Sequence, residues 1–235
     1  DRLFTGGDAF WKPSKFVEAE LYSFVRTFGD TGFTSETGSK GPLHDATSGL
    51  RLRLMRGRFD VKGESGVQRG HRAGDGVSAW FGAVRASMEL PGGWKPRVQA
   101  EWIGASGDKN PTDGISQRYE PVYWSGHGYL GALDVVGCSN VMDWNGVIVV
   151  QPRTTWGANA EFHHFSLMQA RDAWADDAGT TLRRSTAGAA GTDIGTELDL
   201  GFKWDPRPRV GLTGGWSHLW LGEFVQNTGG GSDVD

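Results

Sequence analysis

Residues 192–206, TDIGTELDLGFKWDP, alternate between apolar side chains and charged or small ones. One parity holds Ile194, Thr196, Leu198, Leu200, Phe202 and Trp204, and the other holds Gly195, Glu197, Asp199, Gly201 and Lys203. Because successive side chains of a β-strand point to opposite faces, this pattern predicts a strand with one apolar and one charged face. The sheet that contains it must separate an apolar environment from a polar one.

The same alternation recurs along the chain and predicts an all-β fold of about ten strands. In GLRLRLM, for example, three leucines fall on one parity and Arg51 and Arg53 on the other. We expect strands within residues 16–28, 49–55, 58–64, 77–90, 94–104, 142–151, 155–165, 194–204 and 209–220, with a weaker one at 128–136.

The turns between these strands differ in length. PGG, QPRT and DPRPR are short, whereas the predicted loops at 29–46, 65–76, 105–127, 170–192 and after Phe224 are long and polar. Short turns at one end and long loops at the other are typical of an antiparallel up-and-down transmembrane β-barrel of the outer membrane. A soluble carbohydrate-binding β-sandwich also alternates, and is kept as an alternative.

Composition excludes several classes of protein. The formal charge of −4 does not favour a nucleic-acid partner, and Cys138 is the only cysteine, which excludes an intrachain disulfide. No apolar run approaches the roughly 20 residues of a membrane-spanning helix. The sequence carries no nucleophile elbow, P-loop or assignable pair of glycosidase carboxylates, so we expect neither an enzyme nor a cofactor.

The segments between Lys95 and Thr228 resemble the alginate-export family of bacterial outer-membrane β-barrel proteins. The resemblance is carried by KPRVQAEWIGASGDKNPTDG, YLGALDVVGCSN, FHHFSLMQARDAW and, most closely, GTELDL followed by GGWSHLWLGEF. It implies an outer-membrane channel or porin that passes a charged or polar solute by passive diffusion, for example an anionic polysaccharide such as alginate. Membrane lipid, the solute and other envelope or assembly subunits are the implied partners.

Members of that family are longer than this chain. We therefore expect residues 1–235 to form a single β-barrel domain that lacks N-terminal strands and the closing C-terminal strand. A structural barrel that acts as a scaffold subunit in a larger outer-membrane assembly, with its lumen plugged, is the second interpretation.

In a barrel the apolar parity faces lipid and the charged parity faces an aqueous lumen. The predicted lumen-facing residues for solute contact are Arg51, Arg53, Arg58, Lys62, Arg85, Arg97, Glu161, Glu197, Asp199 and Lys203. The cations cluster in the first half of the chain and the last carboxylates in the second. Two hypotheses follow: opposed charged arcs that guide a solute, with Arg51 and Arg53 as the first contacts, or a network of cross-strand ion pairs.

Metal sites are only weakly indicated. His163 and His164 are adjacent, so on a strand their imidazoles point to opposite faces and cannot share a metal ion. Asp108, Asn110 and Asp113 in SGDKNPTDG have a spacing that suits Ca²⁺, but an acidic exposed loop explains them equally well. Trp174 in RDAWADD is predicted either to stack on sugar rings or to pack within its loop.

Overall fold

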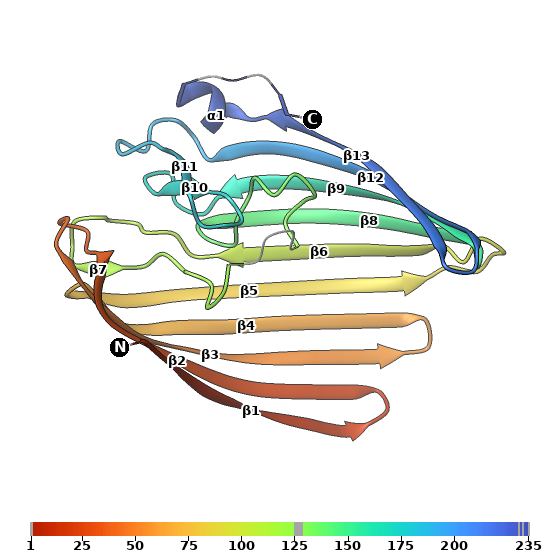
Figure 1. The fold of residues 1–235 in the computed structure, drawn as a ribbon, viewed down its shortest axis with the longest axis horizontal. Coiled ribbons are helices and arrows are strands. Elements are labelled where there is room, and N and C mark those ends of the chain that lie inside the picture. Colours follow the sequence, from red (N-terminus) through yellow and green to blue (C-terminus); the bar gives the residue numbers. More distant parts are fainter. Residues whose placement is uncertain (1, 125–128, 230, 232, 235) are drawn as a thin grey trace.

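The computed structural model describes residues 2–124, 129–229, 231 and 233–234. Their fold is an antiparallel meander in which each long strand pairs with the next along the chain (Figure 1). The elements are β1 (Arg2–Ser14), β2 (Val17–Thr34), β3 (Lys40–Arg56), β4 (Phe59–Arg72), β5 (Asp75–Glu89), β6 (Arg97–Ala105), β7 (Ile115–Ser116), β8 (Val141–Arg153), β9 (Trp156–Leu167), β10 (Ala173–Ala175), β11 (Thr181–Arg184), β12 (Asp193–Arg207), β13 (Val210–Leu221) and the helix α1 (Glu223–Asn227).

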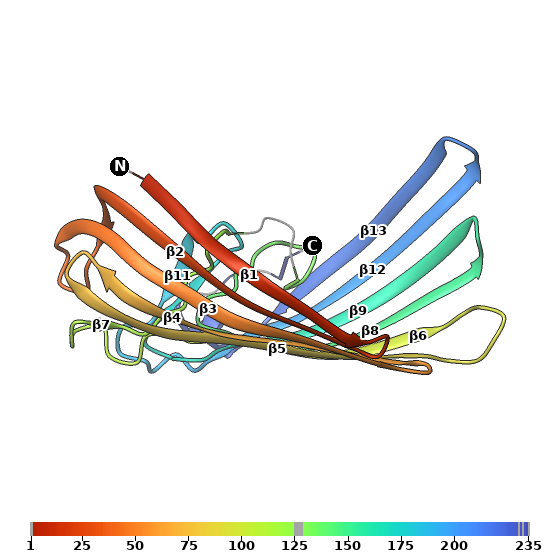
Figure 2. The same ribbon diagram turned by 90° about the horizontal axis from the view of Figure 1, so that it is seen from below.

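The main sheet runs in the order β1-β2-β3-β4-β5-β6-β8-β9-β12-β13, and the short β7 pairs with β5 in parallel. Figure 2 shows that this sheet curves into an open trough. Among the described residues β1 and β13 are its edges and do not pair with each other, although Leu219 of β13 bridges to Val234. A second, separate sheet contains only β10 and β11, so no sheet of sandwich size faces the main sheet within the described part.

Period-two alternation explains the two faces of the trough. On the convex face large apolar side chains remain exposed, among them Leu200 at 44 %, Phe202 at 54 % and Trp204 at 48 %. The concave face carries the charged parity in the middle of the strands. Towards the long-loop end the concave face becomes apolar, and the buried core lies there beneath two excursions of the chain. The first is formed by the described residues 106–124 and 129–140 and is called the 106–140 excursion, and the second is formed by residues 168–192.

Several expectations about the strands are corrected. Arg2–Ser14 forms β1, which was not predicted, and residues 129–136 of the predicted weak strand form bends and irregular backbone; residue 128 lies outside the described residues. The predicted loop at 65–76 is instead a two-residue turn at Ala73–Gly74 between β4 and β5, and that at 29–46 shrinks to residues 35–39. The concave face of these extra strand segments is covered by the chain, since Leu43, Asp45 and Gln68 are buried and Gln68 donates to the carbonyl of Glu120.

A bulge corrects the predicted direction of Ile194. The register between β12 and β9 shifts between Asp193 and Gly195, where Gly195 has φ of +146°. The shift turns Ile194 to the concave side, where it is fully buried with Phe165 and Phe224.

Candidate functional site

A single row of polar side chains crosses the concave face of the sheet. Strand register places one such residue from each of eight neighbouring strands directly beside the next. In order from β2 to β12 the row is Glu18, Arg53, Lys62, Arg85, Glu101, Asn145, His163 and Glu197. We call it the polar row. Three cations stand on the adjacent strands β3, β4 and β5, and carboxylate, amide and imidazole groups follow from β6 onward.

Carboxylates hold the arginines at the β2–β6 end of the row. Arg53 lies 2.7 Å from Asp60 and 3.6 Å from Glu18, and the neighbouring Arg51 lies 3.2 Å from Glu20 and 3.0 Å from Glu64.

Arg85 continues the pattern on the next two strands, since its Nη2 donates to Glu101 at 2.6 Å. These contacts are the cross-strand ion pairs of the second hypothesis. They offset most of the positive charge that the first hypothesis assigned to this half.

Carboxylates surround a buried histidine at the β8–β12 end. His163 has no exposed surface, and its Nδ1 lies 2.9 Å from an oxygen of Asp143. Its Nε2 lies 3.2 Å from Glu161 and 4.0 Å from Asp199. The Nδ2 of Asn145 donates to the same Asp143 carboxylate at 2.9 Å. This acidic half contrasts with the paired half, so the two ends of the row differ in electrostatic character.

The excursion 106–140 packs on the concave face and is bonded to the strands around it. Arg26 pairs with Asp45 at 2.5 Å and also donates to the carbonyl of Pro121 at 3.1 Å. Gln68 donates to the carbonyl of Glu120 at 2.9 Å. The ring of Tyr119 lies 4.7 Å from that of Phe81.

On the opposite side of the trough Glu197 anchors the same excursion. Its Oε1 accepts the backbone N–H groups of Ala132 at 2.8 Å and Leu133 at 3.1 Å. The excursion therefore bridges the two halves of the polar row.

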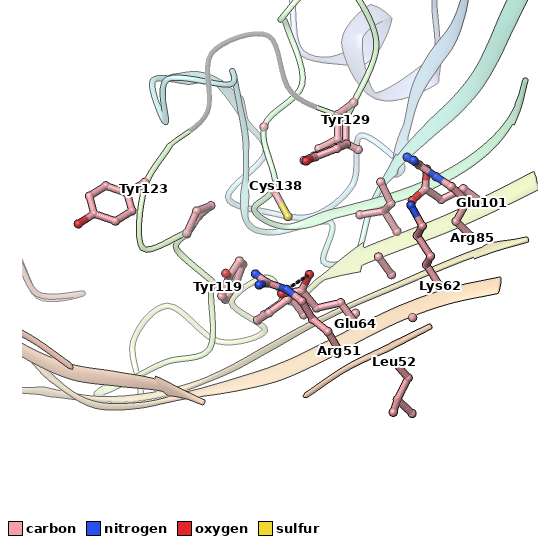
Figure 3. A pocket seen from close by; sticks show the side chains of 18 of the residues that line it. Arg51, Leu52, Lys62, Glu64, Arg85, Glu101, Tyr119, Tyr123, Tyr129 and Cys138 are labelled. Atoms are coloured by element: carbon pink, nitrogen blue, oxygen red, sulfur yellow. Dashed lines mark hydrogen bonds and ion pairs between the residues drawn. The ribbon is translucent and has the colours of Figure 1, made fainter. Parts of the chain in front are cut away.

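A cavity of about 650 Å³ lies between this excursion and the first half of the polar row. Figure 3 shows Arg51, Glu64, Lys62, Arg85 and Glu101 on its wall, with Tyr119, Tyr123, Tyr129 and Cys138 contributed by the excursion. Leu52 points away from these side chains, as its parity requires (Figure 3). The cavity therefore combines charged side chains from the strands with aromatic ones from the loop.

The predicted site residues fall into three groups. Arg51, Arg53, Lys62 and Arg85 line the cavity. Glu161, Glu197 and Asp199 belong to the acidic half around His163. Arg58, Arg97 and Lys203 lie near the short turns, where Arg97 donates to Gln99 at 2.7 Å and Lys203 pairs with Asp205 at 3.3 Å. The structure does not bring this last group to the cavity.

The predicted divergence of the two histidines is confirmed, because His163 is buried on the concave side while His164 is exposed.

The Ca²⁺ candidates do not converge. Asp108 is buried, whereas Asn110 and Asp113 are exposed, and Asp108 and Asp113 accept backbone N–H groups of their own loop. Within the described part of the chain, no group of three or more His, Cys, Asp or Glu side chains is arranged to hold a metal ion.

Two further residues take structural positions. Trp174 is buried, and its Nε1 donates to the carbonyl of Val135 at 2.9 Å, so it packs within the loops. Burial raises the pKa of the Cys138 thiol to about 12, which keeps it protonated at neutral pH.

Sequence reasoning missed the tyrosines of the excursion and the central place of His163. Their signal was present in the sequence, since all four tyrosines of the chain are Tyr22, Tyr119, Tyr123 and Tyr129. Tyr22 donates to Glu64 at 2.5 Å, and the other three line the cavity. Tyr119 and Tyr123 lie in the predicted loop at 105–127 and Tyr129 follows two residues after it, and such a concentration indicates a functional surface.

Comparisons with known proteins agree with this geometry. No described helix has the length and apolar character needed to cross a membrane. No curated protein matches the sequence. A family model described as "Alginate export" matches residues 1–234. The chain therefore belongs to the alginate export family of outer-membrane β-barrel transport proteins.

Proposed function

We propose that this protein forms a passive channel through which a polysaccharide crosses the outer membrane along the concave face. The observation that carries the proposal is the polar row, which lines the concave face with hydrogen-bonding side chains on eight neighbouring strands, where they can bind the hydroxyl groups of a chain that passes through the lumen. Exposed apolar side chains on the convex face support the same arrangement, with lipid outside and water inside.

Closure of the barrel is part of this proposal. The free backbone groups at a sheet edge within lipid would each cost several kcal/mol, because lipid cannot hydrogen-bond to them. The edges β1 and β13 must therefore pair with other strands in the membrane.

Single-channel conductance of the full-length protein in planar bilayers tests the proposal, with the reversal potential measured under a salt gradient. We expect open channels in the wild type. The double variant Arg51→Ala/Arg53→Ala leaves Glu18, Glu20 and Asp60 without their arginine partners, so its reversal potential should shift towards cation preference. Absence of conductance from folded, inserted protein would contradict a channel.

One observation favours a second function, a structural barrel with an occupied lumen. Residues 106–140 and 168–192 already cover the apolar part of the concave face, and Glu197 holds the first of them in place. A scaffold of this kind would insert and fold but would not conduct, so the same measurement separates the two functions.

A further inference from the structure

We propose that the cavity between the 106–140 excursion and the polar row is a binding subsite for a neutral, hydroxyl-rich saccharide unit. This inference rests on the proposed function, because it names the class of polysaccharide that the channel takes. We attribute the preference for a neutral saccharide to hydrogen bonds and aromatic contacts, with little contribution from net charge.

The charges of the cavity lining argue against selection of a polyanion. Its cations are Arg51, Arg53, Lys62 and Arg85, and its carboxylates are Glu18, Glu20, Glu64, Glu101, Asp134 and Asp177. The four glutamates alone match the four cations in number. Arg51 and Arg85 each lie within 3.0 Å of one of these glutamates, and Arg53 lies 3.6 Å from Glu18 and 2.7 Å from Asp60. A uronate chain would have to compete with these fixed carboxylates for every arginine, and it would meet repulsion from their negative charge.

The rest of the concave face adds to this effect. The polar row continues from Glu101 to Glu197 past Asp143, Glu161 and Asp199, which surround His163. An anionic chain in the lumen would therefore also face excess negative charge on the β8–β12 side of the trough. A neutral chain is not repelled by these carboxylates.

The ion pairs suit the recognition of hydroxyl groups. A guanidinium carries five N–H donors and a carboxylate about four acceptor positions, so a paired Arg51 and Glu64 still have hydrogen-bonding capacity to offer. Mutual pairing also fixes both side chains before a ligand arrives, which lowers the entropic cost of binding. Donors and acceptors lie side by side, an arrangement that matches adjacent sugar hydroxyls.

Aromatic side chains on the excursion complete the subsite. Tyr123 and Tyr129 are each 71 % exposed, although both line the cavity. Exposed rings can pack against the apolar C–H face of a sugar while their hydroxyls remain hydrated. The cavity volume of about 650 Å³ lies within the ordinary range for a small-ligand pocket.

Isothermal titration of the detergent-solubilised full-length protein tests the subsite directly. The two probes are cellohexaose, which is neutral, and a hexamer of mannuronate, which carries a carboxylate on every unit. We expect cellohexaose to bind at least about tenfold more tightly. Tyr129→Ala should weaken its binding by about three- to tenfold, and Tyr129→Phe should retain most of the affinity because the ring remains. Trp156→Ala, which removes a ring from the convex face, serves as the control.

Removal of a carboxylate from the cavity tests whether fixed negative charge weakens the binding of an anionic saccharide. Glu64→Gln removes one of the two carboxylates that hold Arg51 and should raise mannuronate affinity several-fold. Asp205→Asn makes the same change in charge near a short turn, outside the cavity, and should leave that affinity unchanged.

Tighter binding of mannuronate than of cellohexaose by the wild type, or no binding of cellohexaose, would overturn the proposal. Saccharide binding without channel conductance would instead refute the proposed transport function and leave the subsite in place.

Discussion

Asp108 lies in a buried position where its charged form is disfavoured. Burial and the nearby carboxylates of Glu36 and Asp172 raise the pKa of Asp108 to about 7, against an ordinary value of 3.8. The folded segment therefore holds the Asp108 proton more tightly than the unfolded one does. The resulting stabilisation is fully present below about pH 4 and is lost as the pH rises towards 7.

The raised pKa of Asp108 predicts that the local stability of this segment falls as the pH rises. Between pH 5 and pH 8 the amide protection of residues 106–120, corrected for intrinsic exchange rates, should fall by about tenfold or more in the wild type. Asp108→Asn imitates the protonated acid and should remove most of that fall. Asp113→Asn changes an exposed carboxylate of the same segment, so its profile should match the wild type. Equal profiles for wild type and Asp108→Asn would contradict the assignment.

At the scale of elements, the docking of residues 129–137 depends on a close approach to β12. Gly131 has φ of +82°, and a Cβ at this position would collide with the Glu197 carboxylate that accepts the N–H groups of Ala132 and Leu133. Glycine is required here for two separate reasons, its left-handed backbone conformation and the lack of space.

Gly131→Ala should therefore release this segment from the sheet. The backbone strain alone costs about 1–3 kcal/mol, and the collision with Glu197 adds to it. Hydrogen exchange of residues 129–137 in the full-length protein should accelerate well beyond that seen in the control. Gly114→Ala is that control, because Gly114 also has a positive φ, +75°, but has open space around its Cβ position. Similar local effects of the two variants would show that the contact with Glu197 is unimportant.

The strands differ in how well the sequence predicted them. Strands with one charged and one apolar face, such as β3 and β12, were predicted because bilayer and lumen impose opposite polarities on neighbouring residues. The strand β1 was missed because Phe4 and Phe10 share a parity with Asp8 and Lys12, which conceals the alternation.

Tertiary contacts decided the rest of the site. The inward packing of residues 106–140 depends on partners such as Arg26 and Gln68, which lie far away in the sequence. Lumen-facing residues follow from parity alone, but the register that aligns eight of them into one row does not. The number of residues in each strand and turn sets that register, and the predicted boundaries at 29–46 and 65–76 were wrong by several residues.

For the whole molecule, one curved sheet must face two different solvents. Leu200 on β12 and Asn159 on β9 lie on adjacent strands at nearly the same level, one on the convex and one on the concave face. Leu200→Arg should reduce the free energy of unfolding in lipid vesicles by about 2–4 kcal/mol, because the guanidinium is forced into hydrocarbon. Asn159→Arg adds the same side chain to the aqueous face and should cost far less. Urea unfolding of the full-length protein from vesicles measures both. Equal destabilisation by the two substitutions would mean that the convex face does not meet lipid, and the assignment of the two faces would then be wrong.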